Sequence, residues 1–441
     1  MKFVAEEVTE RLLREDATLF VGDTASHSLG WVHHVQRYLG SWLDETAKSL
    51  PVNTGKTFLF GMGGSSSPAR FYAEAKGNSS LRVLDTSSPD SIRGCTFDDC
   101  VVIASSKSGT TIETQALLAH ALANGLKVEN LVIITDPGTS LGELGKSIGA
   151  RVVEGDPCTG GRFSALSPFG IIPALYGGWS VDALRDELAR NKLTAELVQA
   201  AWAQATDLVG ESTQALFPLP SDPLSSGSAL WLEQLIAETT GKAGRGLIPY
   251  WNGGSSPLQP SSILFWHLVA SFAADLLGVD PFNQPNVEIA KKNVLMTLGT
   301  NDFAIHDFGD SEQLIRSFES ASVRELNIYC PIEAYSQVSS LRTVVTSKFG
   351  ATSANIGPRY LHSTGQLFKG GPTTMATLQV VVRPKGQPQR ISGRRFSFHD
   401  LFLAQALCDF EAMRGEDRAI WLLVVDDLSE AEHFFVDRTS A

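Results

Sequence analysis

The chain has 441 residues, of which 43% are hydrophobic and 19% are charged, and its net charge is −12. This length and composition predict a globular protein of about two or three domains with a large apolar core. The acidic excess argues against a nucleic-acid partner. The most membrane-like run, residues 263–279, contains His267 and Asp275 and is typical of a core helix rather than a membrane span.

Five cysteines are scattered along the chain, at positions 95, 100, 158, 330 and 408. They form no Cys-x-x-Cys pair and no Cys/His cluster with zinc spacing, so no metal ion is expected. Their odd number and scatter favour reduced thiols in a cytoplasmic protein. Residues 1–16 alternate charged and apolar side chains and lack the apolar core of a signal peptide, which favours the same compartment.

The first part of the chain alternates predicted strands and helices. After a helical stretch over residues 1–50, short apolar runs predict parallel strands at residues 57–61, 82–85, 100–104, 131–135 and 151–154. Helical segments fall between these runs. The alternation predicts an α/β fold with an open, doubly wound parallel sheet.

Two hydroxyl-rich turns follow the first and third of these strands. Gly61-Met-Gly-Gly-Ser-Ser-Ser-Pro68 and Ser105-Ser-Lys-Ser-Gly-Thr-Thr-Ile-Glu-Thr114 each join the end of a strand to the start of a helix. Both turns open on one edge of a parallel sheet, where backbone N–H groups and helix dipoles favour an anion. Neither is a Walker loop, so a phosphate monoester fits better than a triphosphate. The alternative is an ordinary polar turn with a threonine cap.

A third glycine-rich turn carries a single arginine. In Thr159-Gly-Gly-Arg-Phe-Ser-Ala-Leu-Ser-Pro168, Gly160 and Gly161 free the backbone beside Arg162. A guanidinium group has five N–H donors and is suited to holding an oxyanion. The alternative is that Arg162 is a surface charge in a loop.

A change in composition predicts a domain boundary. Three prolines between residues 217 and 226 predict a linker after a helical segment. This places an N-terminal domain at residues 1–225 and a C-terminal domain at residues 226–441. Apolar runs at residues 325–329, 378–382 and 419–425 alternate with helical segments and predict a second α/β sheet.

The helix predicted over residues 230–242 places a carboxylate on an apolar face. Trp231, Leu235 and Glu238 stand at positions i, i+4 and i+7 and share one side of the helix. Partial burial favours the use of such a carboxylate as a general base. Gln234 lies one turn before Glu238, and Glu233 is expected on the opposite, solvated side. The alternative is that Glu238 lies only at the edge of the apolar stripe.

Two later segments add polar side chains. Pro281-Phe-Asn-Gln-Pro-Asn-Val-Glu-Ile-Ala-Lys-Lys292 predicts a loop that opens a helix at Pro285, with Lys291 on the second turn. Residues 360–372 combine His362 with hydroxyl groups and glycines. The basic loop at residues 383–395 is expected on the surface.

Five motifs together resemble the glucose-6-phosphate isomerase family, which is built from two sugar isomerase (SIS) domains. They stand in the family's order: Gly61-Met-Gly-Gly-Ser65, Ser106-Lys-Ser-Gly-Thr-Thr111, Gly160-Gly-Arg-Phe-Ser164, Glu238-Thr-Thr-Gly-Lys242 and Phe282-Asn-Gln-Pro-Asn-Val-Glu288 with Lys291. The second half is most similar to the isomerase part of bacterial transaldolase/glucose-6-phosphate isomerase fusions, through Gly357-Pro-Arg-Tyr-Leu-His-Ser-Thr-Gly-Gln366 and Lys369-Gly-Gly-Pro372. The resemblance implies two SIS-type, flavodoxin-like parallel-sheet domains.

The resemblance also implies a role for each motif. Glu238 would carry a proton between C1 and C2 of the sugar, and Arg162 would stabilise the enediolate. Lys291 and His362 would assist ring opening. The residues implied to bind the substrate and its phosphate are Gly64, Ser65, Ser106, Lys107, Ser108, Thr111, Gly161, Gln234 and Gln284.

Two positions depart from the family pattern. Asn286 stands where the family has glycine, and asparagine tolerates left-handed backbone better than most residues. The family's ring-opening histidine lies in a His-Gln-Gly-type segment, for which His362 is the nearest counterpart in this sequence.

The resemblance therefore implies a cytoplasmic, homodimeric aldose–ketose isomerase of glucose 6-phosphate and fructose 6-phosphate. Its partner would be a small sugar phosphate, with no cofactor, nucleic acid or membrane. Two alternatives remain open: an isomerase of another hexose phosphate, and a non-catalytic SIS-type sensor of sugar phosphates.

Overall fold

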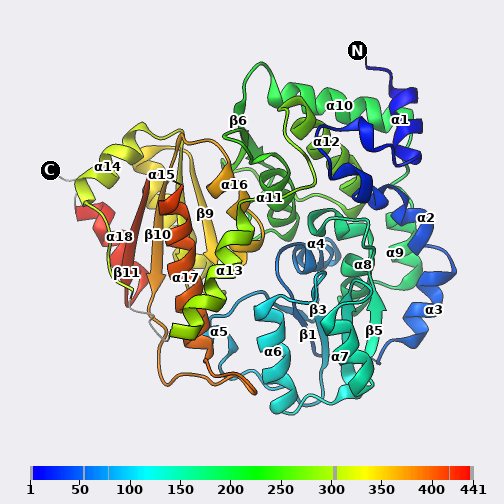
Figure 1. Cartoon of the computed structure of the whole chain (residues 1–441), viewed down its shortest axis with the longest axis horizontal. Helices are drawn as coiled ribbons and strands as arrows, with labels where there is room; N and C mark the ends of the chain where they lie inside the picture. The colour runs from blue at the N-terminus through cyan, green and yellow to red at the C-terminus, as the bar shows by residue number, and fades with distance from the viewer. Residues whose placement is uncertain (1–2, 53–54, 78, 301–304, 417, 438–441) are drawn as a thin grey trace.

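Two parallel sheets, each flanked by helices, form the two lobes of the molecule (Figure 1). The figure draws a computed structural model, which describes residues 3–52, 55–77, 79–300, 305–416 and 418–437. A helical layer that contains the N-terminal segment covers one side of the first lobe.

The first sheet has five parallel strands in the order β2-β1-β3-β4-β5. Its strands β3 and β4 are buried along their whole length, because helices cover both faces. The strands are β1 (Thr57–Phe60), β2 (Leu81–Leu84), β3 (Val101–Ser105), β4 (Leu131–Thr135) and β5 (Arg151–Glu154), and the helices of this lobe are α4 (Ser67–Lys76), α5 (Pro89–Ile92), α6 (Ile112–Ala123), α7 (Ser140–Ile148) and α8 (Pro168–Tyr176). The sheet predicted from the apolar runs is confirmed.

The second sheet has four parallel strands in the order β11-β10-β8-β9. In chain order this is the arrangement 2-1-3-4, the same as the first four strands of the first sheet, so both sheets are doubly wound as predicted. The strands are β8 (Val323–Tyr329), β9 (Thr352–Gly357), β10 (Met375–Val382) and β11 (Ile420–Val425), and the helices are α13 (Val287–Thr300), α14 (Ser311–Ser320), α15 (Tyr335–Phe349), α16 (Gly365–Gly370), α17 (Phe398–Gly415) and α18 (Leu428–Asp437). Helix α13 begins at Val287, two residues after the expected start at Pro285.

The linker predicted over residues 217–226 is irregular only from residue 220 onward, because its first three residues belong to β6 (Gln214–Leu219), which forms a pair of parallel strands with β7 (Gly246–Trp251). Phe217 and Pro218 belong to β6, opposite Pro249 and Tyr250 of β7. Each strand of a two-stranded pair has a free edge, and an edge position tolerates a proline without an N–H donor. Pro218 therefore lies in an edge strand, whereas Pro220 and Pro223 lie in the irregular segment between β6 and α11.

The helical layer packs around one long buried helix, α11. Helix α11 contacts α4 of the first lobe, α12 and β7, and α10 packs along α12. The helices of this layer are α1 (Ala5–Leu13), α2 (His34–Tyr38), α3 (Ser41–Ser49), α9 (Val181–Leu188), α10 (Ala195–Val209), α11 (Gly227–Thr240) and α12 (Ile263–Leu276). Helix α12 is the core helix expected from the apolar run at residues 263–279, and across the described ranges no helix is long and apolar enough to cross a bilayer.

The two lobes share an apolar core. One cluster of buried side chains includes Phe60 and Val102 of the first sheet and Leu326 and Val380 of the second. This core continues from one lobe into the other and gives no point at which to divide the chain. The predicted domain boundary between residues 225 and 226 therefore stays a prediction.

Candidate functional site

A cavity of about 350 Å³ lies at the carboxyl edge of the first sheet, where ligands bind in open α/β sheets. Three short segments deliver residues to it: the 3₁₀ helices η4 (Gly63–Ser65) after β1, η6 (Gly161–Leu166) after β5, and η8 (Arg359–His362) after β9. Of the residues implied to act, those that line the cavity are Gly64, Ser65, Lys107, Ser108, Thr111, Gly161, Arg162, Gln234, Glu238, Gln284 and His362. Positions far apart in the sequence therefore meet in one space.

The hydroxyl-rich turn after β3 faces this cavity. Ser108 and Thr111 line it, and Ser106 lies behind them with its Oγ donating to Thr111 Oγ1 at 2.9 Å. Thr111 is the residue before α6, but its side chain accepts no capping hydrogen bond from that helix. In an ordinary threonine cap the hydroxyl would accept a backbone N–H of the helix, and the Thr111 hydroxyl does not. The start of α6 favours an anion beside it.

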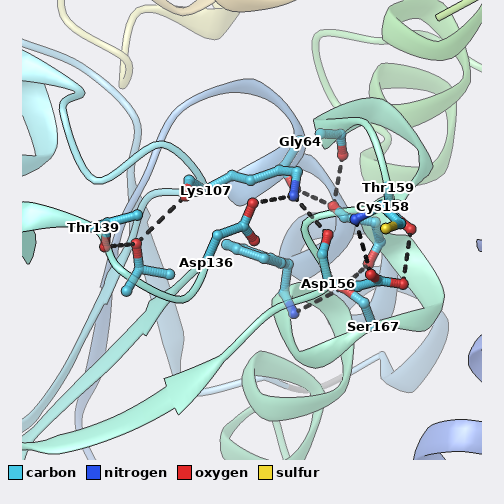
Figure 2. A network of polar contacts seen from close by, with 12 residues as sticks. Gly64, Lys107, Asp136, Thr139, Asp156, Cys158, Thr159 and Ser167 are labelled. Atoms are coloured by element: carbon cyan, nitrogen blue, oxygen red, sulfur yellow. Dashed lines mark hydrogen bonds and ion pairs between the residues drawn. The ribbon is translucent and has the colours of Figure 1, made fainter. Parts of the chain in front are cut away.

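Lys107 lies in the same turn, and its ammonium group contacts two residues of the first lobe. Figure 2 shows Nζ between the Asp136 carboxylate and the backbone carbonyl of Asp156, which accepts a hydrogen bond at 2.7 Å. Burial raises the pKa of Asp136, and the charge of Lys107 opposes that rise. Lys107 and Asp136 both line the cavity, so this wall carries a pair of opposite charges rather than a free cation.

The glycine turns after β1 and β5 touch each other. A Cβ atom on Gly64 would lie 2.1 Å from the carbonyl oxygen of Gly161, so only glycine fits there. Ser164 Oγ donates to the Gly64 carbonyl at 2.9 Å and ties the turns together. A Cβ atom on Gly161 would meet nothing within 4 Å, which leaves open space beside the Arg162 backbone.

The side chains of the expected general base and of the expected oxyanion-stabilising arginine are in direct contact. Arg162 Nη1 lies 3.3 Å from Glu238 Oε1, and both side chains are almost completely buried, with residues 3% and 7% exposed. Arg162 Nε donates to Thr239 Oγ1 at 3.0 Å, and Nη2 donates to the Asn283 carbonyl at 3.2 Å. Burial lowers the pKa of Arg162, and the charge of Glu238 acts in the opposite direction. Arg162 is therefore a fixed, buried cation and not the surface charge of the alternative interpretation.

Gln234 connects this pair to the histidine. Its Nε2 donates to Glu238 Oε2 at 3.0 Å and to the His362 carbonyl at 3.1 Å. Its Oε1 accepts a hydrogen bond from Ser67 Oγ at 2.7 Å. Both N–H donors of the amide and one of the two acceptor positions on its oxygen are therefore used within the protein. Gln234 therefore orients Glu238 directly.

His362 is paired with a buried carboxylate that sequence reasoning missed. His362 Nε2 lies 2.9 Å from Glu113 Oε1, and Gln405 Nε2 donates to the same oxygen at 2.5 Å. Burial works to raise the pKa of Glu113, but the charge and hydrogen bond of His362 outweigh burial and the pKa is lowered. Glu113 belongs to the hydroxyl-rich motif, and its position there was the available signal. Nothing local to Gln405, 292 residues away, could have indicated this contact.

Glu233 corrects the expectation of a solvated side on α11. Its residue is only 3% exposed, and burial raises its pKa to about 8. From Ser228 to Thr240 every residue of α11 is buried. A helix enclosed on all sides has no solvated face, whatever its sequence pattern suggests.

Two of the expected residues, Ser106 and Lys291, remain. Ser106 supports Thr111 rather than lining the cavity itself. Lys291 lies in α13, and its side chain is outside the described part of the structure, so its role stays a prediction. Within the described ranges, no three His, Cys, Asp or Glu side chains are grouped as a metal site requires.

Parts of the chain are similar in sequence to known proteins. No family model matches the chain. A glucose-6-phosphate isomerase of Campylobacter jejuni is 28% identical over 50% of this chain and 59% of its own, and one of Rubrobacter xylanophilus is 31% identical over 34% and 38%. The chain resembles the glucose-6-phosphate isomerase family. It spans about half the length of the curated relatives it matches.

Solved structures match along most of the chain at low similarity. A hypothetical protein of Thermus thermophilus is 18% identical with a TM-score of 0.33, covering 98% of this chain and 86% of that one. A glucose-6-phosphate isomerase of Chlamydia trachomatis is 15% identical with a TM-score of 0.28, covering 97% and 72%. At these TM-scores the likeness says nothing about the site.

Proposed function

We propose that this chain is an aldose–ketose isomerase that interconverts glucose 6-phosphate and fructose 6-phosphate. The observation that carries the proposal is the buried contact of 3.3 Å between Glu238 and Arg162, inside a cavity whose other wall is rich in hydroxyl groups. A carboxylate beside a fixed cation is what proton abstraction next to a carbonyl requires. The relatives named glucose-6-phosphate isomerase support the same reaction.

The hydroxyl-rich wall is proposed to bind the phosphate. Ser65, Ser108 and Thr111 line the cavity near the start of α6, and Ser106 holds Thr111 in place. Hydroxyl donors and the positive end of a helix dipole together favour a phosphate monoester. Lys107 contributes less than a free lysine, because Asp136 neutralises it.

The proton transfer then follows from the positions of Glu238 and Arg162. In the open-chain aldose, Glu238 removes the proton from C2, and the electron pair forms the C1–C2 double bond while negative charge develops on the C1 oxygen. Arg162 stabilises that charge. Glu238 returns its proton to C1, the proton of the O2 hydroxyl passes to the O1 oxygen, and a ketone forms at C2 with a hydroxyl at C1. The reaction is redox-neutral overall and consumes no co-reactant.

Ring opening is assigned to His362 with Glu113. The Glu113 carboxylate fixes the orientation of the imidazole at 2.9 Å, as the carboxylate of a His–Asp pair does in other enzymes. Lys291 is proposed to assist at the same step, and Gln284 to contact the sugar hydroxyls. We further propose that the enzyme acts as a homodimer in the cytoplasm, without a cofactor, nucleic acid or membrane.

The test is conversion of fructose 6-phosphate to glucose 6-phosphate by the purified chain, coupled to glucose-6-phosphate dehydrogenase. Glu238→Gln keeps the shape but removes the base, so kcat is expected to fall about 10²- to 10⁴-fold. The matched control is Glu312→Gln, an exposed glutamate of α14, which should retain full activity. Turnover of Glu238→Gln at the control rate would contradict the proposal. Binding of the sugar phosphate without turnover in the unmodified chain would instead favour the sensor.

A further inference from the structure

A second cavity, of about 360 Å³, lies between the lobes and shares no lining residue with the first. We call it the Arg359 cavity. Its polar lining comes from Arg359, Tyr335, Arg70, Glu74, Ser225 and Ser226, and apolar walls come from Leu81, Val83 and Leu230. This size and mixture are typical of small-molecule sites.

Arg359 is a buried cation that lines this cavity. Its residue is 5% exposed, and its guanidinium donates to Tyr335 Oη at 3.4 Å. No carboxylate in the described ranges forms an ion pair with it. The neighbouring arginines differ, because Arg70 is paired with Asp85 at 2.7 Å and Arg342 with Asp222 at 2.5 Å. A buried charge without a direct ion pair gains from a negative group at close range, so an anion beside Arg359 would be stabilised.

The acidic groups around Arg359 have other hydrogen-bond partners or are protonated. Glu233 lies close enough to interact electrostatically, but burial raises its pKa to about 8 and keeps it protonated at neutral pH. Glu74 is the one acidic side chain among the residues that line this cavity, and its Oε2 accepts the backbone N–H of Ser228 at 2.8 Å. Burial acts to raise the pKa of Asp85, whereas the charges of Arg70 and Arg359 lower it. Both oxygens of Asp85 accept hydrogen bonds from Arg70, and Asp222 is paired with Arg342.

We propose that the Arg359 cavity binds a small organic anion, a carboxylate or a phosphate monoester, through Arg359 and the Tyr335 hydroxyl. The phenol oxygen accepts from Arg359, which leaves its own proton free to donate to an oxyanion. The charged end of the ligand lies at these two groups, and Leu81, Val83 and Leu230 contact its carbon skeleton.

This site shares three supporting elements with the proposed active site. Segment η8 carries Arg359 at its first residue and His362 at its last. On α11, Leu230 lines the Arg359 cavity one turn before Gln234. On α4, Arg70 lines the Arg359 cavity, and Ser67 donates to Gln234. An anion that neutralises Arg359 stabilises η8, and with it the contact of His362 with Glu113, so it raises kcat. This coupling rests on the proposed function, whereas the binding site does not.

Crystals soaked in selenate test the site, because selenium is located by its anomalous scattering. We expect one peak beside Arg359 and Tyr335 and a second beside Ser108 and Thr111. Arg359→Gln should remove the first and leave the second. Tyr335→Phe, which keeps the ring, should weaken the first and serves if Arg359→Gln fails to fold. No peak at Arg359 in the unmodified chain, or a peak that persists in Arg359→Gln, would overturn the site.

Solution measurements identify the ligand class and the coupling. Titration with inorganic phosphate and with malonate, followed by calorimetry in a Thr111→Val background, separates a phosphate site from a carboxylate site. Heat that disappears in Arg359→Gln supports the proposal, and heat unchanged by that substitution contradicts it. The anion that binds should raise kcat at saturating fructose 6-phosphate, and an unchanged kcat would overturn the coupling. A chain with no turnover that still binds selenate at Arg359 would refute the proposed function alone.

Discussion

At the scale of single residues, Gln234 holds the proposed active site together. Its amide joins the base Glu238, the carbonyl of His362 and the hydroxyl of Ser67, which come from α11, η8 and α4. Hydrogen bonds to a charged group are stronger than those between neutral groups, so the hydrogen bond to Glu238 is the strongest of the three. A side chain that uses its polar atoms in this way acts as a positioning residue.

Substitution of Gln234 by leucine tests this assignment. Gln234→Leu keeps the volume but releases Glu238 and leaves the Ser67 hydroxyl without its partner. We expect kcat for fructose 6-phosphate to fall about tenfold to a hundredfold, with a loss of about 1–3 kcal/mol in the free energy of unfolding. Gln313→Leu on the exposed side of α14 is the control. A variant with unchanged kcat would show that Glu238 is oriented by other contacts.

At the scale of elements, the site depends on how closely two turns approach each other. The turn after β1 and the turn after β5 meet at Gly64 and Gly161, and the second turn delivers Arg162. The backbone contact sets the distance between the hydroxyl wall and the guanidinium group. A change of about 1 Å in such a distance is enough to reduce turnover severely.

Gly64→Ala is expected to separate these turns. The added Cβ atom would lie 2.1 Å from the Gly161 carbonyl, and backbone atoms cannot yield as a flexible side chain can. We expect kcat/KM for fructose 6-phosphate to fall by about a hundredfold or more, while the far-ultraviolet circular dichroism stays that of a folded protein. Gly299→Ala, at a helical glycine whose Cβ atom would meet nothing within 4 Å, is the control. Equal activity of the two variants would contradict the role of the close approach.

At the scale of the whole molecule, the core encloses carboxyl groups that it cannot ionise easily. Burial raises the pKa of Glu325 to about 8, and a hydrogen bond from Thr377 Oγ1 at 2.7 Å opposes the rise only in part. The value in an unfolded chain is about 4.5. Between these two values the folded protein holds a proton that the unfolded chain has lost, so stability falls as the pH rises and becomes constant above about pH 8.

Glu325→Gln should remove this part of the alkaline loss of stability. Glutamine has nearly the same shape and carries no charge, so its contribution is the same at every pH. We expect the free energy of unfolding in urea to fall less between pH 5 and pH 9 in Glu325→Gln than in the unmodified chain, by an amount of the order of a few kcal/mol. Glu312→Gln, at an exposed position, should leave the pH dependence unchanged. Parallel curves for the unmodified chain and Glu325→Gln would contradict the shifted pKa.

The sequence by itself determined the local elements and the types of side chain at the site. Every strand of the first sheet was predicted from its apolar run, because a buried parallel strand requires such a run. Three strands were missed. Strand β9 reads Thr-Ser-Ala-Asn-Ile-Gly and lacks such a run, whereas β6 and β7 are apolar but each contains a proline, Pro218 and Pro249. The glycine turns and the helix with Glu238 were also visible, because turn chemistry and helical spacing are local properties.

Only the tertiary structure decided which distant side chains meet. The pairing of His362 with Glu113 spans 249 residues, and the burial of Glu233 depends on which elements surround α11. The cavity beside Arg359 likewise forms only when both lobes are in place. Sequence patterns report periodicity and local preference. Hydrogen-bond partners, burial and pKa shifts depend on the packing of elements that are remote in the chain.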